Sequence, residues 1–265
     1  MNRLRKHARV IGRLWRIAMQ EHLALRWQFL AVMADNVVGV ALSILLFEIA
    51  YADAPVIGDW TKYEAILLVG VFQLYSVFLR VFLWPNVGQM TDVIYGGELD
   101  ELLLWPMSTQ VLLSLRSIDL PALLHGVIGL AIIAYALDQL DTLPGFWQVL
   151  AALGLLLCGV VIVYALWFMS MTLEFWFSGL WSWRSFVPNL FDFAKYPEGI
   201  YEGGIRFVFL TIAPVIVVAN VPAQALLGDL AWRTAIWSLF LAATLLALSR
   251  WQWRFAVRHY TSVGS

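Results

Sequence analysis

The sequence predicts an all-α polytopic membrane protein with six transmembrane helices and with both termini in the cytoplasm. Hydrophobic residues make up 62% of the chain and charged residues only 13%, whereas soluble domains carry about 25% charged residues. The mean hydropathy is +0.78, and apolar segments long enough to cross a bilayer recur along the chain. We therefore expect a single transmembrane domain over residues 1–265, with little chain left for a soluble domain.

The first element expected is an amphipathic helix over residues 1–26 that lies in the membrane interface. Arg5 and Arg9 belong to its basic face, and Leu4 and Trp15 belong to the opposite, apolar face. This division is typical of a helix that lies on the inner membrane surface. Such a helix is either a simple topology anchor or a contact for a cytoplasmic partner, and the sequence leaves both readings open.

Six apolar segments are the candidate transmembrane spans, and they cover about 27–51, 63–84, 109–137, 146–177, 204–221 and 232–253. The third and fourth are longer than a bilayer requires, so we expect them to tilt or to project into the cytosol. The fifth is interrupted by Pro214. A broken or re-entrant element is expected there, shielded from lipid by protein.

The basic residues set the expected orientation. With the N-terminus inside, fifteen of the seventeen Lys and Arg residues fall on cytoplasmic segments and span ends, and only Lys62 and Arg233 fall outside. The outer connections carry acidic residues instead, namely Asp53, Asp59, Asp138, Asp141 and Asp229. Cytoplasmic loops are normally rich in Lys and Arg, so this asymmetry favours cytoplasmic termini.

One connection departs from that rule, because residues 89–107 contain acidic residues and no basic one. The acidic residues are Asp92, Glu98, Asp100 and Glu101. Gly96 and Gly97 precede a Leu-rich stretch, 98–105, that Pro106 ends. We expect a short cytoplasmic coupling helix that docks on a partner protein. The alternative is a plain glycine turn followed by a solvated helix start, a position that acidic residues suit.

A second connection is expected over residues 178–203. It is the longest polar stretch after the N-terminal region, and Pro188, Pro197 and Gly199 break helices within it. We expect an ordered cytoplasmic connection built from short helices.

The sequence lacks the common signatures of catalysis and of metal binding. It has no phosphate-binding Gly-x-x-x-x-Gly-Lys-Ser/Thr loop, no His-Glu-x-x-His, no Cys-x-x-Cys and no Gly-x-Ser-x-Gly. The four histidines are scattered, and Cys158 is the single cysteine. We therefore expect no catalytic residue, cofactor or metal on this chain. The net charge of −1 gives no indication of a nucleic-acid partner.

Asp35 is the best candidate for a charged residue inside the bilayer. It lies about two turns into the first expected span. Intramembrane charges are costly and often functional. We expect Asp35 to be buried in the bundle, either as a structural residue with a hydrogen-bonding partner or as a residue that handles substrate.

Three stretches resemble the membrane subunit of bacterial ATP-binding-cassette (ABC) export systems, in the type-2 export permease superfamily. The first, Ile94 to Pro106, is similar to the family's Gly-x-Leu-Asp-x-Leu-Leu-x-x-Pro signature. The second is Phe193 to Pro197 with Ile200-Tyr201, and the third runs from Ala213-Pro214 through Asn220-Val221-Pro222-Ala223 to Leu227-Gly228. Their order and spacing match the family, and the six-span plan covers the whole chain. Trp105 stands where the family usually has Arg.

The resemblance implies how such a chain would work. Two membrane subunits, either two copies of this chain or this chain and a similar one, would pair in the bacterial inner membrane, among its lipids. A pair of cytoplasmic ATPases holding ATP and Mg²⁺ would bind beneath them and drive export. The implied ATPase contacts are Asp92, Tyr95, Gly96, Glu98, Leu99, Asp100, Glu101 and Leu102.

The apolar spans favour a hydrophobic or amphipathic substrate over a sugar or an ion. Two alternatives to transport remain from the sequence. One is an integral membrane enzyme that acts on lipid, for which clustered polar residues near one interface would be needed. The other is a membrane scaffold that recruits an ATPase without transport, which ATP-driven substrate movement in vesicles would exclude.

Overall fold

The computed structural model describes residue 15 and residues 26–177 and 183–260, and this part of the chain is almost entirely helical. The elements at the start of the chain are α2 (Arg26–Ala50), β1 (Val56–Ile57), β2 (Trp60–Thr61), α3 (Lys62–Phe78), η1 (Leu79–Leu83), η2 (Val87–Gln89), α4 (Met90–Tyr95) and α5 (Glu98–Leu103). The middle of the chain forms α6 (Thr109–Leu115), η3 (Pro121–Leu123), α7 (Leu124–Gln139), α8 (Phe146–Thr172) and η4 (Leu173–Phe175). The last elements are α9 (Trp183–Phe191), η5 (Asp192–Lys195), η6 (Glu198–Ile200), α10 (Gly203–Thr211), α11 (Val215–Leu227) and α12 (Trp232–Arg258).

Five stretches of helix among the described residues are long and apolar enough to cross a membrane. They are Met33–Ala50, Lys62–Leu83, Pro121–Gln139, Phe146–Phe175 and Trp232–Arg258. The bent pair α10–α11 passes the same test as one unit, with an angle of 81° between its halves. The predicted fold class, an all-α polytopic membrane protein, is confirmed.

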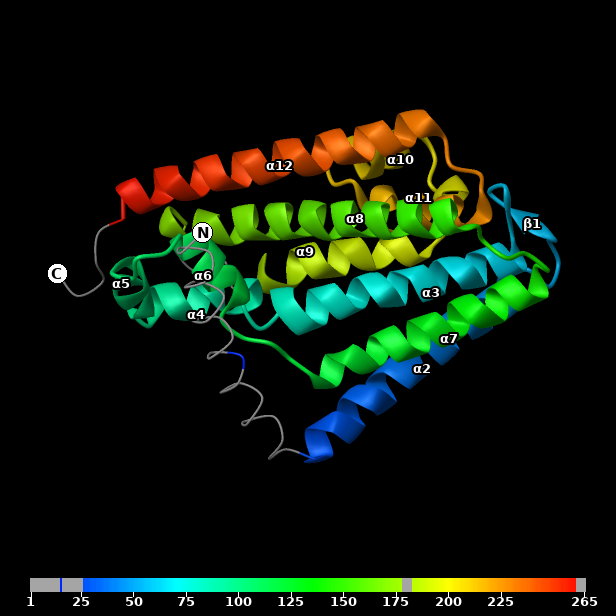
Figure 1. Ribbon diagram of the computed structural model, residues 1–265, viewed down its shortest axis with the longest axis horizontal. Coiled ribbons are helices and arrows are strands. Elements are labelled where there is room, and N and C mark those ends of the chain that lie inside the picture. The colour runs from blue at the N-terminus through cyan, green and yellow to red at the C-terminus, as the bar shows by residue number, and fades with distance from the viewer. Residues whose placement is uncertain (1–14, 16–25, 178–182, 261–265) are drawn as a thin grey trace.

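The helices form an elongated bundle with two distinct ends (Figure 1). The short helices α4, α5 and α6 lie at one end, which we name the α5 end. The β1–β2 hairpin lies at the other, which we name the β1 end. The long helices run between these ends, and α8 packs along both α11 and α12.

Glycines allow two of these helix pairs to approach closely. A Cβ atom at Gly70 would lie 3.0 Å from the Gly129 carbonyl oxygen, so α3 and α7 meet at these two residues. A Cβ atom at Gly159 would lie 2.9 Å from Val218 Cα, which brings α8 against α11. Small residues serve this purpose in membrane helices, where backbone packing replaces the hydrophobic driving force.

The third expected span is broken. Residues 109–137 form α6 and α7 rather than one helix, and the chain between them is not α-helical. Pro121 lacks the N–H that a continuous helix needs. Asn86 fixes the break, because its Nδ2 donates to the Phe82 and Ser117 carbonyls at 2.6 and 2.7 Å. Its Oδ1 accepts the Ser117 N–H at 2.9 Å.

The connection expected over residues 178–203 does not stay at one end of the bundle. Arg184, in α9, pairs with Asp92 at the α5 end. Gly199 packs so tightly against Gly58, in the turn between β1 and β2, that neither residue has room for a Cβ atom. Nine α-helical residues, four 3-10 residues and the extended Tyr196 and Pro197 cover about 28 Å, close to the thickness of the bilayer core. The segment α9–η5 therefore runs between the two ends of the bundle and is long enough to cross the bilayer core.

The pair α10–α11 is correspondingly not the fifth span expected over 204–221. Glu198 and Arg206, before and within α10, line the same pocket as Leu227 and Asp229 at the end of α11. Asp59 of the β1–β2 turn also lines it. Since the pair begins and ends at the β1 end, it is a re-entrant hairpin. The expectation of a broken or re-entrant element near Pro214 is met, whereas the expected cytoplasmic position of Arg206 does not agree with this packing.

Asn220 explains how this irregular backbone is accommodated. The side chain is fully buried, and its Oδ1 accepts the Glu198 N–H at 2.8 Å. Its Nδ2 donates to the carbonyls of Ala194 and Tyr196 at 3.2 Å. Non-helical backbone at membrane depth needs such partners. One side chain of α11 therefore supplies hydrogen bonds to the backbone groups at the end of η5 and just after it.

Candidate functional site

The predicted coupling segment consists of two short helices joined by an elbow. α4 ends at Tyr95, and α5 begins at Glu98. Gly97 between them has a φ of +77° and forms the N-cap of α5. Glycine adopts this left-handed conformation without steric cost. The short helix expected after the two glycines is present as α5, and residues 89–107 as a whole are not one helix.

The inner side of this segment holds it to the bundle. Leu99 is fully buried and belongs to the main hydrophobic core, and Leu102 packs against that core. Val93 and Ile94 of α4 are buried in the same cluster. Of Leu99 and Leu102, both in the predicted contact set, Leu99 is therefore enclosed within the chain, whereas Leu102 is half-buried.

The outer side of the segment carries the remaining predicted residues. Asp92, Tyr95, Gly96, Glu98 and Glu101 are exposed, and Asp100 is half-buried. Leu104 was not among the predicted contacts, yet it is 84% exposed just after α5. Residues 102–104 are all leucine, so the sequence does not show which of them is exposed. We name the exposed residues Asp92, Tyr95, Gly96, Glu98, Glu101 and Leu104 the acidic surface.

Three polar contacts fasten the acidic surface to other helices. Arg116 Nη1, at the end of α6, lies 2.9 Å from Glu98 Oε2. Arg184 Nη1, in α9, lies 3.4 Å from Asp92 Oδ2. Thr91 Oγ1, next to Asp92, donates to the buried Glu174 carboxylate at 3.2 Å. The segment is thus tied to α6, to α9 and to η4, which follows α8.

Asp35 does not lie in the bundle interior as expected. Its side chain is exposed on α2. It lines the mouth of a polar cavity of about 230 Å³, together with Asn36, Gly39, Ser43, Val69, Phe72, Gln73, Tyr75, Ser76, Leu79, Arg80, His125, Asp192 and Lys195. The expectation of burial is wrong for the single chain, because α2 packs on its neighbours with only a narrow stripe and leaves most of its surface uncovered.

The cavity behind Asp35 contains polar atoms that lack partners. Tyr75 Oη, Asn36 Nδ2 and His125 Nε2 are buried without a hydrogen bond among the described residues. His125 Nδ1 lies 3.3 Å from Gln73 Oε1, so it carries the proton and leaves Nε2 as an acceptor in the neutral ring. Buried polar groups are normally paired, so this cavity is suited to water or to a polar group of a ligand.

The comparisons with known proteins agree with this architecture. A family model described as ABC-2 family transporter protein matches residues 37–264. No curated protein and no solved structure matches the chain. The family consists of membrane components of ABC transporters, and the candidate spans agree with a multi-pass protein of the plasma membrane. Because the match covers most of the sequence and confirms the resemblance, the chain belongs to the ABC-2 family of transporter proteins.

Proposed function

We propose that this ABC transporter permease exports a hydrophobic or amphipathic substrate, driven by a separate pair of cytoplasmic ATPases that dock on the acidic surface. The observation that carries the proposal is the acidic surface itself. It projects at one end of the bundle, exposes Leu104 among carboxylates, and is fastened to three other helices. An exposed apolar residue ringed by charge is the composition of a docking site with a polar rim.

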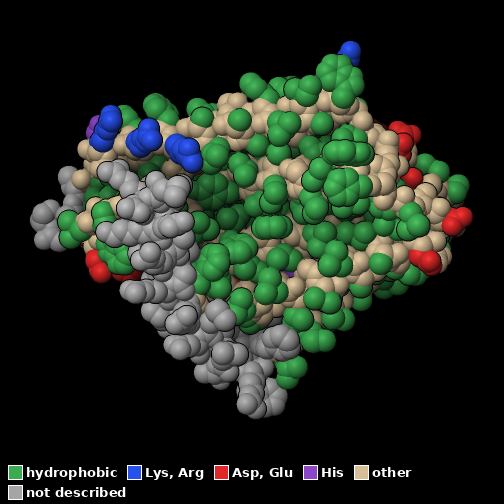
Figure 2. All heavy atoms as spheres, viewed as in Figure 1, with side chains coloured by type: hydrophobic (Ala, Val, Ile, Leu, Met, Phe, Trp, Pro, Cys, Tyr) green, Lys and Arg blue, Asp and Glu red, His purple; other side chains and the backbone are tan. Residues whose placement is uncertain are grey.

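The charge distribution supports a cytoplasmic location for the α5 end. Figure 2 shows the basic side chains of α12 gathered toward this end and acidic side chains at the β1 end. Five of the described basic residues lie beside α4, α5 or α6 at the α5 end, namely Arg116, Arg184, Arg250, Arg254 and Arg258. Arg80 and Lys195 line the cavity beside Asp35. Lys62, Arg206 and Arg233 belong to the β1 end. This difference follows the positive-inside rule and supports cytoplasmic termini.

The fastening contacts provide a route from the ATPase to the spans. Closure of the ATPase pair would push on α4 and α5. The Asp92–Arg184 pair would pass the displacement to α9, and the Glu98–Arg116 pair would pass it to α6. Because Leu99 is locked in the core, the segment would move as a rigid body with the attached helices.

A second permease subunit would cover α2. Only 17% of the α2 span is buried, against 67% of the α3 span. Its exposed apolar residues include Val38, Leu42 and Ile49. Asp35 lies on this same exposed surface, and a carboxylate facing lipid is costly. A second copy of the chain on α2 would shelter Asp35 and place the polar cavity between the subunits.

ATP hydrolysis is assigned to the partner because the sequence has no phosphate-binding loop. ATP and Mg²⁺ would bind to the ATPases, with no cofactor on the permease. The two alternatives, a lipid-modifying membrane enzyme and a scaffold without transport, predict no ATP-driven movement of a substrate.

The test is reconstitution of the permease with its ATPase in lipid vesicles that contain a fluorescent phospholipid. ATP should move the label between leaflets, and a matched preparation with a catalytically dead ATPase should not. If the active complex forms and hydrolyses ATP, but neither the phospholipid nor any probe from a panel of amphipathic dyes moves, the transport proposal is wrong.

A further inference from the structure

A large cavity lies at the α5 end, apart from both the acidic surface and the Asp35 cavity. It has a volume of about 890 Å³, within the size range of small-molecule sites. Its walls come from the end of α3 with η1, from α6, from α8 and from α12. This cavity has no role in the proposed docking mechanism.

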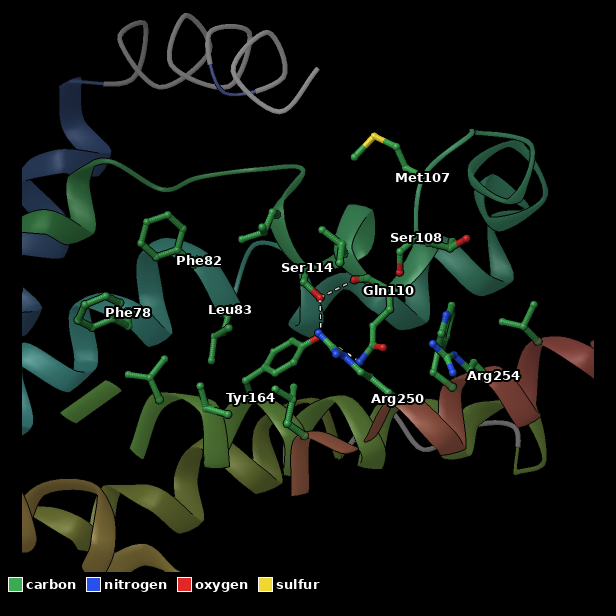
Figure 3. Close-up of a pocket in the computed structure, with 18 of the residues that line it drawn as sticks. Phe78, Phe82, Leu83, Met107, Ser108, Gln110, Ser114, Tyr164, Arg250 and Arg254 are labelled. Carbon is green, nitrogen blue, oxygen red and sulfur yellow. Dashed lines mark hydrogen bonds between the residues drawn. The ribbon is translucent and has the colours of Figure 1, made fainter. Parts of the chain in front are cut away.

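One side of the cavity is apolar. Phe78 and Phe82, on the α3–η1 segment, face Val160 and Val161 of α8, and Leu246 of α12 completes this wall. Figure 3 shows the two phenylalanines together on one side of the cavity. Trp15 packs on Phe82 with 5.9 Å between ring centroids. This side therefore suits a hydrocarbon chain.

Three neutral polar residues of the lining, Gln110, Ser114 and Tyr164, form a hydrogen-bonded network. The Ser114 hydroxyl donates to the Gln110 carbonyl at 2.6 Å, so the Tyr164 hydroxyl, 2.8 Å away, donates to Ser114 Oγ. The Gln110 side chain donates to Tyr164 and to Ser249 at 3.2 and 3.1 Å. The members of this network therefore have little unsatisfied hydrogen-bonding capacity for a ligand.

The cations at the cavity are different. Arg250, Arg254 and Arg258 line it from successive turns of one face of α12. All three side chains are exposed, and none forms an ion pair with a described residue. The described lining contains no Asp or Glu. Figure 3 shows Arg254 on the side of the network opposite to the phenylalanines and the side chain of Arg250 drawn across the network.

We propose that this cavity binds an anionic phospholipid of the membrane leaflet at the α5 end. The headgroup phosphate would bind Arg250 and Arg254, because guanidinium groups recognise phosphate through paired hydrogen bonds. An acyl chain would lie along Phe78, Phe82 and Val161. These cations have no ion-pair partner among the described residues, and they lie beside an apolar recess at the end of the membrane spans. This arrangement matches a molecule that carries both a negative charge and a hydrocarbon tail.

The test measures retention of phosphatidylglycerol by the purified, delipidated permease with native mass spectrometry. The double variant Arg250→Gln/Arg254→Gln should bind the lipid about tenfold more weakly than the unmodified chain. The matched control is Arg233→Gln, which removes an exposed charge at the opposite end of the same helix and should bind as before. Val161→Trp, which fills the apolar side without altering charge, should also weaken binding.

Two further ligands separate a lipid site from a simple anion site. Phosphatidylcholine, which has the same tails without net charge, should bind more weakly, and glycerol phosphate, which lacks tails, should not displace the lipid. Equal binding of phosphatidylcholine, displacement by glycerol phosphate, or unchanged binding in the double variant would each overturn the proposal. If the double variant does not fold, Val161→Trp and the ligand comparison on the unmodified chain decide it.

Discussion

Arg184 Nη1 lies 3.4 Å from Asp92 Oδ2, and this contact joins the acidic surface to α9, which is followed by η5, η6 and the re-entrant hairpin. Arg184 also lies over the Trp84 ring, with 6.0 Å between its Cζ atom and the ring centroid. The guanidinium is thus held by a carboxylate and by an aromatic face, on the boundary between the proposed docking site and the membrane spans.

We predict that Arg184→Gln weakens coupling without weakening assembly. An exposed ion pair contributes only about 0–1 kcal/mol to stability, so the melting temperature and ATPase binding should change little. The proposed transmission to α9 would be lost, so transport per ATP hydrolysed should fall several-fold. Transport and hydrolysis are measured on the same vesicles, with Arg233→Gln as the control for loss of an arginine. Unchanged coupling would mean that the contact transmits nothing.

Charge reversal on α5 should weaken docking of the ATPase. In Asp100→Lys/Glu101→Lys, the ATPase should no longer co-purify and transport should be lost, because like charges at an interface cost several kcal/mol. The protein should still reach the membrane, since both residues lie outside the spans. The control reverses Asp138, an acidic residue near the β1 end. If the double variant binds the ATPase and transports normally at equal membrane levels, then α5 is only a solvated turn and not a docking element.

Labelling of single cysteines distinguishes the structure from the sequence-based topology. With Cys158 replaced by Ala, cysteines at Asp59, Asp141, Asp229 and Ile200 should react with an impermeant reagent from outside the cell, and one at Asp100 should not. Ile200 decides between the two topologies. It is exposed next to Gly199 at the β1 end, whereas the sequence placed residues 178–203 in the cytoplasm. Protection of Ile200 from outside, with Asp59 labelled, would contradict a membrane-crossing α9–η5 segment.

Asn220→Ala should destabilise the fold. The substitution leaves one buried carbonyl, one partly buried carbonyl and one partly buried N–H without their partner, and a buried unsatisfied group costs about 1–3 kcal/mol. The purified variant should melt several degrees lower and aggregate earlier on heating. The control is Gln139→Ala, at an exposed site on α7. A melting curve that matches the unmodified protein would show that water replaces the amide.

Four spans could be predicted closely from the sequence because each is an uninterrupted apolar run. The segments expected at 27–51, 63–84, 146–177 and 232–253 correspond to α2, α3 with η1, α8 with η4, and α12. Their ends coincide with polar or aromatic residues such as Lys62 and Trp232, where the hydrophobic signal changes abruptly. Local composition was sufficient for these helices.

The segment α9–η5 escaped prediction because distant contacts stabilise it. Pro188, Pro197 and Gly199 indicated a connection over residues 178–203. Asp192 and Lys195 within it line the polar cavity beside Asp35. The hydrogen bonds from Asn220 reach residues more than twenty positions away, and no local pattern indicates them.

The acidic surface was predicted in part. Its carboxylates identified it, but α5 has only six residues, too few to reveal that Leu99 faces inward and Leu104 outward. The partners Arg116 and Arg184 come from other helices and had no local signal.

The last prediction concerns α2. If a second copy covers this helix, Leu42→Cys in a chain without Cys158 should form a disulfide-linked dimer in the membrane on mild oxidation. The matched control is Leu130→Cys on α7, since Leu42 and Leu130 are 61% and 60% exposed and lie on different helices. Leu130→Cys should stay monomeric. Asp35→Asn should preserve the cross-link because an amide still satisfies polar neighbours, whereas Asp35→Lys should reduce it, because the two-fold symmetry expected of such a dimer brings the same surface of both copies together. Cross-linking through Leu130 but not Leu42 would place the partner on α7 and would leave Asp35 facing lipid.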